Sequence, residues 1–179
     1  TGFLGSTGDS LHQKKYVHEI YQLADKNVSS KVTVPILWDK KTNTIVNNES
    51  AEIIRILNYS FNDLSNNFDD YYPDNLQNEI DEINEVIYQN INNGVYKTGF
   101  SKTQSSYEAA AKKLFHSLDM IENKLENQMY LVGNVLTEAD IRFLPTLLRF
   151  DCVYYLHFKC NLKKITEYNN CLLYTSPSP

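Results

Sequence analysis

The thiols are the first side chains in this sequence that could do chemistry. The 179 residues contain three cysteines, Cys152, Cys160 and Cys171, an odd number without framework spacing, which favours reduced thiols. His157 lies between two of them, but three such groups within nine residues match no zinc spacing, so we predict no metal site. Cys160 could act as a nucleophile only if a nearby cation or helix end lowered its pKa. Most of these cysteines are therefore expected to be packing residues.

Two short segments could bind a ligand through the backbone. The bond before a proline is the only peptide linkage at which a cis conformation is cheap, about 0.5–1 kcal/mol relative to trans. A cis bond between Val34 and Pro35 would turn the Val34 backbone outward, and a strand-edge proline without a ligand is the alternative. Glu49 and Ser50 open a predicted helix, where free N–H groups and the Ser50 hydroxyl could receive a carboxylate and Glu49 an ammonium. An ordinary N-cap is the alternative there.

The elements that must position these segments follow from the spacing of apolar residues. Apolar side chains recur at helical spacing over residues 17–24, after a stretch of capping side chains at residues 7–10. Residues 32–37 and 44–46 are rich in β-branched side chains on either side of a turn-like stretch, which predicts a hairpin. A helix is expected at residues 51–57. The first third therefore has the predicted order α-β-β-α.

The rest of the chain is predicted to be helical. Two apolar stripes predict two long helices, with Ile80, Ile83, Ile87 and Ile91 in the first and Leu114, Leu118, Ile121 and Leu125 in the second. Thr137 and Asp140 have the spacing of a capping box at the start of a further helix. We expect both to be structural, and a substitution of either to cost about 0.5–2 kcal/mol.

Composition and chain organisation narrow the class of protein. The formal net charge is −5, so the chain has no excess of basic residues that would favour binding to nucleic acid or to an anionic membrane. No apolar run approaches the roughly 20 residues that cross a bilayer, so we predict a soluble, cytoplasmic protein. The domain prediction has four parts. They are a first domain at 1–58, a polar surface linker at 59–73, an all-helical domain at 74–170 and an atypical tail at 171–179.

Four long stretches of this sequence resemble one family. They are VTVPILWDKKTNTIVNNESAEIIRILN at 32–58, EIDEINEVIYQNINNGVYKTGF at 79–100, YLVGNVLTEADIRF at 130–143 and RFDCVYYLHFKCN at 149–161. Together they resemble the xi-class (omega-like) glutathione transferases, the glutathionyl-hydroquinone reductases, over about residues 7–170. The resemblance implies an α/β thioredoxin-like N-terminal domain, incomplete here, followed by an all-α C-terminal domain. It also implies a homodimer.

The resemblance assigns roles to six residues. In the family, the Val34 backbone beside Pro35 pairs with the cysteinyl part of glutathione like an added strand. Glu49 and Ser50 correspond to the anchor of the γ-glutamyl head, which carries both a carboxylate and an ammonium. Tyr96 and Tyr154 are the implied catalytic residues, because two phenols can hold an aromatic diol and stabilise its developing oxyanion. Taken alone, any one of the 13 tyrosines is more often a packing or surface residue.

The implied reaction is thiol–disulfide exchange that reduces glutathionyl-hydroquinones, with glutathione as co-substrate and no metal. Its nucleophile belongs to a Cys-Pro motif in the first strand-to-helix turn of the thioredoxin-like domain, where a helix N-terminus lowers the thiol pKa. The sequence contains no Cys-Pro pair. We therefore expect a fragment that is inactive by itself, an active parent protein, and a foreign tail from Cys171 to Pro179. A non-catalytic binding module and a generic conjugating transferase are the alternatives.

Overall fold

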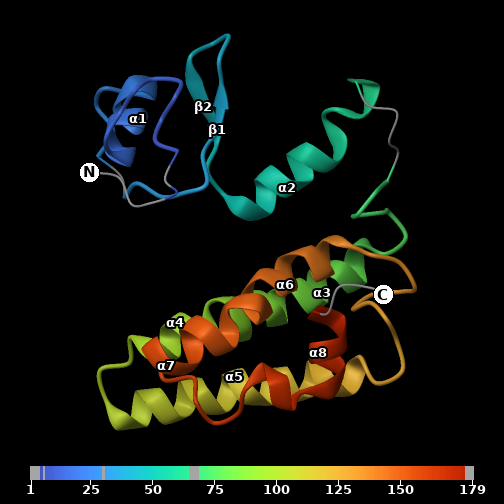
Figure 1. Ribbon diagram of the computed structural model, residues 1–179. Helices are drawn as coiled ribbons and strands as arrows, with labels where there is room; N and C mark the ends of the chain where they lie inside the picture. Colours follow the sequence, from blue (N-terminus) through green and yellow to red (C-terminus); the bar gives the residue numbers. More distant parts are fainter. Residues whose placement is uncertain (1–4, 6, 30, 65–68, 176–179) are drawn as a thin grey trace. The chain divides into compact units, whose positions relative to one another are not determined.

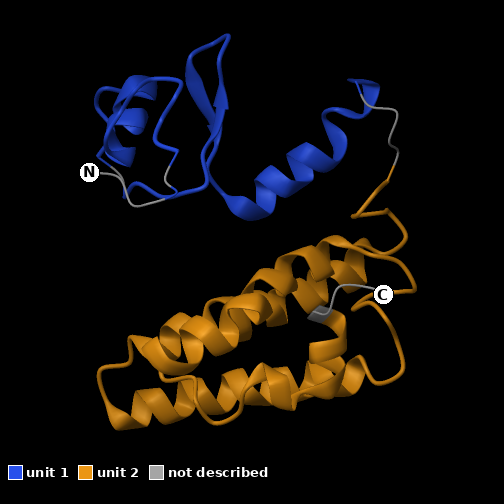
Figure 2. Ribbon diagram, viewed as in Figure 1, with its two compact units in different colours: residues 1–68 blue, residues 69–179 orange. Residues whose placement is uncertain are grey.

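The computed structural model describes residues 5, 7–29, 31–64 and 69–175 (Figure 1). The chain divides into two compact units, residues 1–68 and residues 69–179 (Figure 2). The division falls within the stretch 59–73 that was expected to be a linker. Each unit has its own elements and is described by itself.

Unit 1 has the predicted order of elements. They are α1 (Val17–Ala24), β1 (Leu37–Asp39), β2 (Thr44–Asn47), α2 (Ser50–Tyr59) and the short 3-10 helix η1 (Asn62–Leu64). The two strands pair antiparallel, with Trp38 opposite Ile45 and Asp39 opposite Thr44. In the turn between them, Asn43 has a φ of 60° and its N–H donates to the Asp39 carbonyl at 2.9 Å. Asparagine tolerates this left-handed conformation better than most residues, which suits it to this position.

Two boundaries in unit 1 differ from those predicted. The first strand starts at Leu37 rather than at residue 32, because Pro35 has no N–H to give to a strand ladder. Asp9 does not cap α1. Its carboxylate instead accepts three N–H bonds from residues 11, 12 and 14, which close a separate turn. The helix begins later, where the Glu19 carboxylate accepts the N–H of Tyr16 at 2.8 Å.

Unit 2 is made of helices. They are α3 (Gln77–Val86), the π-helix η2 (Ile87–Asn92), α4 (Gly94–Gly99), α5 (Gln104–Lys124), α6 (Glu138–Arg149), the π-helix η3 (Phe150–Tyr154), α7 (Tyr155–His157), the 3-10 helix η4 (Ile165–Glu167) and α8 (Asn169–Thr175). Helix α5 packs against α4 and α8, and α6 packs against α3 and α8 (Figure 1). No helix among the described residues is long and apolar enough to cross a membrane.

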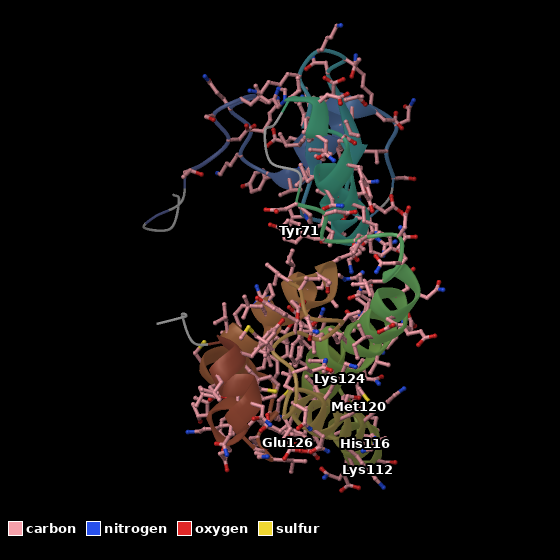
Figure 3. The ribbon with its side chains drawn as sticks, turned by 90° about the vertical axis from the view of Figure 1, so that its right-hand side faces the viewer. Tyr71, Lys112, His116, Met120, Lys124 and Glu126 are labelled. Carbon is pink, nitrogen blue, oxygen red and sulfur yellow. The ribbon has the colours of Figure 1, made fainter. Side chains whose placement is uncertain are left out.

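The two predicted apolar stripes form the centre of unit 2. Ile83 is partly buried, and the other seven side chains of the stripes are buried. The exposed face of α5 is mostly polar and includes the exposed Met120 (Figure 3). Figure 3 shows Lys112, His116 and Lys124 along it, and all three are exposed. The predicted helices are therefore confirmed, but the first of them gives way to the π-helix η2 after Val86.

The capping box at the start of α6 is confirmed. The Asp140 carboxylate accepts the Thr137 N–H at 2.8 Å and the Thr137 hydroxyl at 3.1 Å. It also accepts the Leu131 N–H and the Tyr174 hydroxyl, each at 2.8 Å. Asp140 is almost fully buried. Asp140 therefore does more than cap a helix. It connects α6 both to the loop before it and to the last helix, α8.

The predicted atypical tail begins inside a helix, in the part that the structure describes. Residues 169–175 form α8, and Cys171 is fully buried in the core of unit 2. The Glu122 carboxylate of α5 accepts the N–H groups of Asn170 and Cys171, each at 2.9 Å. Although burial opposes it, these bonds hold the pKa of Glu122 below its ordinary value. Helix α8 is an integral element of unit 2, and residues 176–179 lie outside the described residues.

Candidate functional site

The Val34 backbone is open to a ligand. The Val34–Pro35 peptide is cis, as expected, and Val34 is 70% exposed. Among the described residues, none forms a hydrogen bond with the Val34 N–H or C=O. A neighbouring extended peptide could pair with these two groups as an added strand. Val34 and Pro35 were predicted to contact a ligand. They lie in a segment whose backbone is free to pair with the main chain of a peptide ligand.

Glu49 and Ser50 lie at the N-terminus of α2, as predicted. Ser50 is the first helical residue, Glu49 is the N-cap, and both are exposed. The Glu49 N–H donates to the Asn47 side-chain oxygen at 2.7 Å, so a neighbouring side chain orients the turn before the helix. The N–H groups of a first helical turn and the helix dipole attract a carboxylate. The Glu49 carboxylate beside them adds an acceptor for an ammonium group.

The hydroxyl of Tyr21 links these two segments of unit 1. It donates to the Thr33 carbonyl at 3.0 Å and accepts the Thr33 N–H at 3.3 Å. The Asn48 side-chain amide donates to the same hydroxyl at 2.8 Å and to the Thr33 hydroxyl at 3.0 Å. Although burial opposes it, hydrogen bonds from Thr33 and Asn48 hold the pKa of Tyr21 below its ordinary value. Thr33 precedes Val34, and Asn48 precedes Glu49.

From the sequence, Tyr21 is only one of the apolar residues that recur at helical spacing over residues 17–24. The available signal was weak. A tyrosine on an apolar helical face has a polar tip that must find a partner when the ring is buried, but the sequence does not say which partner. The partners are 12 and 27 residues further along the chain.

Unit 2 brings the two predicted tyrosines together. Tyr96 comes from α4 and Tyr154 from the end of η3, and their hydroxyl oxygens are 3.2 Å apart. Their rings meet edge to face with centroids 5.7 Å apart. Tyr154 is 3% exposed and Tyr96 is 42% exposed. The pair therefore has a buried member and a member that a ligand can reach.

The electrostatics of the pair favour hydrogen-bond donation. Burial, followed by the hydroxyl of Tyr96, raises the pKa of Tyr154 above its ordinary value, and Arg149 opposes the shift. Tyr154 is therefore a neutral phenol near pH 7. It can support Tyr96 as Tyr96 donates to an oxygen atom of a bound ring.

Two phenylalanines complete an aromatic cluster, which we define as Tyr96, Phe100, Tyr154 and Phe158. Phe158 meets the other three rings edge to face, with centroids 5.3–5.4 Å apart. Phe100 stacks on Tyr96 and is 72% exposed. Gly99 allows this packing, because a Cβ atom there would lie 2.8 Å from Phe158 Cβ and 2.9 Å from Cγ. The cluster suits the face of an aromatic ligand.

Cys160 and Cys171 do not resemble activated nucleophiles. Cys160 is fully buried, and burial raises the pKa of its thiol to about 12. Burial likewise raises the pKa of Cys171. Cys152 is exposed, and its thiol donates to the carbonyl oxygens of Leu148 and Arg149. The condition set for Cys160, a lowered pKa, is not met. The described residues contain no group of three metal-binding side chains.

Comparison with known proteins agrees with this architecture. The family model "Glutathione S-transferase, C-terminal domain" matches residues 86–170. The structure is similar to the glutathione-bound structure of YqjG, a glutathione transferase homologue from Escherichia coli K-12, with a TM-score of 0.95 and 50% identity. That alignment covers 98% of this chain and 57% of the other. Unit 2 is therefore the all-helical C-terminal domain of a glutathione transferase, and the two-stranded unit 1 is a piece of the thioredoxin-like domain.

The relatives also define the class. The structure of glutathione transferase xi from Phanerochaete chrysosporium aligns with a TM-score of 0.94 and 48% identity, over 97% of this chain and 59% of the other. The glutathionyl-hydroquinone reductase YqjG of Escherichia coli K12 is 52% identical over 168 residues, and PcpF of Sphingobium chlorophenolicum is 51% identical over 162. The chain belongs to the xi-class glutathione transferases, the family of the glutathionyl-hydroquinone reductases.

The alignments with YqjG and PcpF extend over most of this chain but over about half of each relative. They cover 94% and 90% of this chain, and 51% and 52% of the two relatives.

Proposed function

We propose that this chain is part of a glutathione-dependent reductase of glutathionyl-hydroquinones. The observation that carries the proposal is the pair of tyrosine hydroxyls 3.2 Å apart, in an aromatic cluster. The relatives YqjG and PcpF, which are named glutathionyl-hydroquinone reductases, support it. Unit 1 supplies the glutathione contacts of the proposal, and unit 2 supplies the contacts to the aromatic ring.

The glutathione contacts combine main chain and charge. The Val34 N–H and C=O pair with the cysteinyl residue of glutathione, next to Pro35. The α-carboxylate of the γ-glutamyl head binds the N-terminus of α2 and the Ser50 hydroxyl, and its ammonium group binds the Glu49 carboxylate. Both segments are exposed in unit 1.

The proposed reaction has two thiol-exchange steps. An enzyme thiolate attacks the sulfur of the glutathionyl-hydroquinone, a disulfide to glutathione forms, and the bond between sulfur and the ring breaks. The ring carbon takes a proton and the hydroquinone leaves. A glutathione thiolate then attacks the mixed disulfide, which yields oxidised glutathione and regenerates the enzyme thiolate.

The tyrosines act on the ring in the first step. Negative charge develops on the ring oxygen as the sulfur leaves, and Tyr96, supported by the neutral Tyr154, donates a hydrogen bond to that oxygen. The buried thiols of Cys160 and Cys171 do not fit the role of the nucleophile. We therefore propose that neither Cys160 nor Cys171 is the reacting cysteine of the full-length protein. We also propose a cytoplasmic homodimer, and light scattering tests the stoichiometry.

The test is an assay of the full-length gene product with a glutathionyl-hydroquinone and with a halogenated aromatic compound. Chromatography should show free hydroquinone and oxidised glutathione in equal amounts. Activity on the halogenated compound alone would identify a conjugating transferase. Glutathione binding without turnover of either compound would identify a non-catalytic module.

A further inference from the structure

Tyr21 occupies an unusual place in unit 1, between the two proposed glutathione contacts. It is the one buried residue of α1, with 6% of its surface exposed. Its hydroxyl lies between Thr33, the residue before Val34, and Asn48, the residue before Glu49. One side chain therefore touches the chain directly upstream of both contacts.

The hydroxyl has no unused hydrogen-bonding capacity. A phenol has one donor and accepts up to two bonds. The proton goes to the Thr33 carbonyl, and the oxygen accepts from the Thr33 N–H and from the Asn48 amide. The Asn48 amide also reaches the Thr33 hydroxyl at 3.0 Å, which closes a ring of contacts. Such a closed arrangement fixes the distance between the two backbone segments better than a single bond would.

We infer that Tyr21 is a positioning residue that sets the spacing between the Val34 backbone and the N-terminus of α2, so that one glutathione molecule binds both at once. The inference rests on the proposed function. Its physical basis is preorganisation. A ligand with two anchored ends binds tightly only when the two contacts stand at the distance between those ends. Tyr21 need not touch the ligand.

The test compares two ligands in the full-length gene product and its Tyr21→Phe variant. Glutathione uses both contacts, whereas cysteinylglycine lacks the γ-glutamyl head and uses the Val34 contact alone. Phenylalanine keeps the buried ring and removes the hydroxyl. We expect the variant to bind glutathione about 10-fold more weakly, as the loss of about 1.4 kcal/mol of preorganisation predicts. Its affinity for cysteinylglycine should stay unchanged in titration calorimetry.

Two further variants sharpen the test. Tyr16→Phe is the matched control, because Tyr16 precedes the same helix and is 55% exposed. It should bind glutathione like the wild type. Asn48→Ala leaves the Tyr21 ring in place and breaks the same link, so it should reproduce the selective loss even if Tyr21→Phe fails to fold. The double variant should be no weaker than either single variant, because both changes break one link.

The outcomes separate the inference from the proposed function. A wild-type protein that does not bind glutathione would overturn both. A wild-type protein that binds glutathione as tightly as its Tyr21→Phe and Asn48→Ala variants would overturn the inference alone. If the variants bind both glutathione and cysteinylglycine more weakly, and to the same extent, the inference is also overturned. Such a result would indicate general damage to unit 1 and not a change in the spacing of the two contacts.

Discussion

The two units position their proposed site residues in opposite ways. In unit 1, the described residues include only two buried apolar side chains, Tyr21 and Ile53, and the proposed glutathione contacts lie on exposed backbone. Hydrogen bonds between side chains and loops set their positions. In unit 2, Tyr154 belongs to a continuous buried core, and the aromatic cluster is an extension of that core.

This difference affects how substitutions act. A change in the hydrogen bonds of unit 1 alters the spacing of a site and removes little buried surface. A change near the cluster of unit 2 also disturbs packing, because close-packed interiors respond to a single methylene group. Site geometry and stability are therefore more tightly coupled in unit 2.

The largest effect is expected for Asp140→Ala in unit 2. The change leaves the buried N–H groups of Leu131 and Thr137 and the Tyr174 hydroxyl without their acceptor. An unsatisfied buried group costs about 1–3 kcal/mol, so the free energy of unfolding should fall by about 3–5 kcal/mol. Urea denaturation measures it.

Two milder variants calibrate this loss. Thr137→Ala should cost about 0.5–2 kcal/mol as the loss of a cap, and Tyr174→Phe should cost about 1 kcal/mol as the loss of one hydrogen bond. If Asp140→Ala costs no more than Thr137→Ala, Asp140 is only a cap and unit 2 is less tightly joined than the structure indicates.

The second largest effect is expected on the rate of hydroquinone release. Tyr96→Phe in the full-length gene product should slow hydroquinone release by about 100-fold, as the loss of one oxyanion donor does elsewhere. Glutathione affinity should change little, because the proposed glutathione contacts belong to unit 1. Stopped-flow detection of the hydroquinone gives the rate. Tyr88→Phe is the control, since Tyr88 is also about half exposed and lies outside the cluster. A wild-type rate for Tyr96→Phe would remove Tyr96 from the proposed site.

A smaller effect is expected for Gly99→Ala. The added Cβ atom would overlap Phe158, so the ring must move, at a cost of about 1–3 kcal/mol. Gly94→Ala in the same helix is the matched control, because its Cβ atom would meet Leu114 at an ordinary 3.5 Å. Thermal unfolding of both variants makes the comparison. Equal stability would show that the cluster accommodates the change, unlike a close-packed core.

The smallest effects concern the thiols. At pH 8, iodoacetamide should modify the exposed Cys152 in the native protein and reach Cys160 and Cys171 only after unfolding. Mass spectrometry of tryptic peptides measures this, and Cys152→Ser should abolish the native reaction. Native labelling of Cys160 would contradict the buried core of unit 2.

Burial of Cys160 also makes the stability of unit 2 depend on pH. The folded pKa of about 12 lies above the usual thiol value near 9. The folded form therefore keeps its proton longer than the unfolded form does. This contribution to stability is complete below pH 9 and is lost as the pH rises towards 12. Cys160→Ala should remove this part of the alkaline decline in unfolding temperature.

The sequence by itself determined the order of elements and the main core. Periodic isoleucine and leucine stripes predicted the long helices, because a helix must bury one face, and the Thr137–Asp140 spacing predicted a cap. The motif residues identified the family, and the resemblance singled out Tyr96 and Tyr154 as proposed site residues. These features depend on residues near one another in the chain.

Only the tertiary structure decided which distant groups meet. The Tyr96 and Tyr154 hydroxyls meet across 58 residues, the Tyr21 hydroxyl meets Asn48 across 27, and the Tyr174 hydroxyl meets Asp140 across 34. Short-range sequence patterns carry no information on such pairings, because a tyrosine hydroxyl can form hydrogen bonds with many different partners. The same limit applies to residues 171–175, where the sequence predicted an atypical tail and the structure has the greater part of α8. Its place depends on Glu122, 48 residues before Asn170, and on the buried core of unit 2, which contains Cys171.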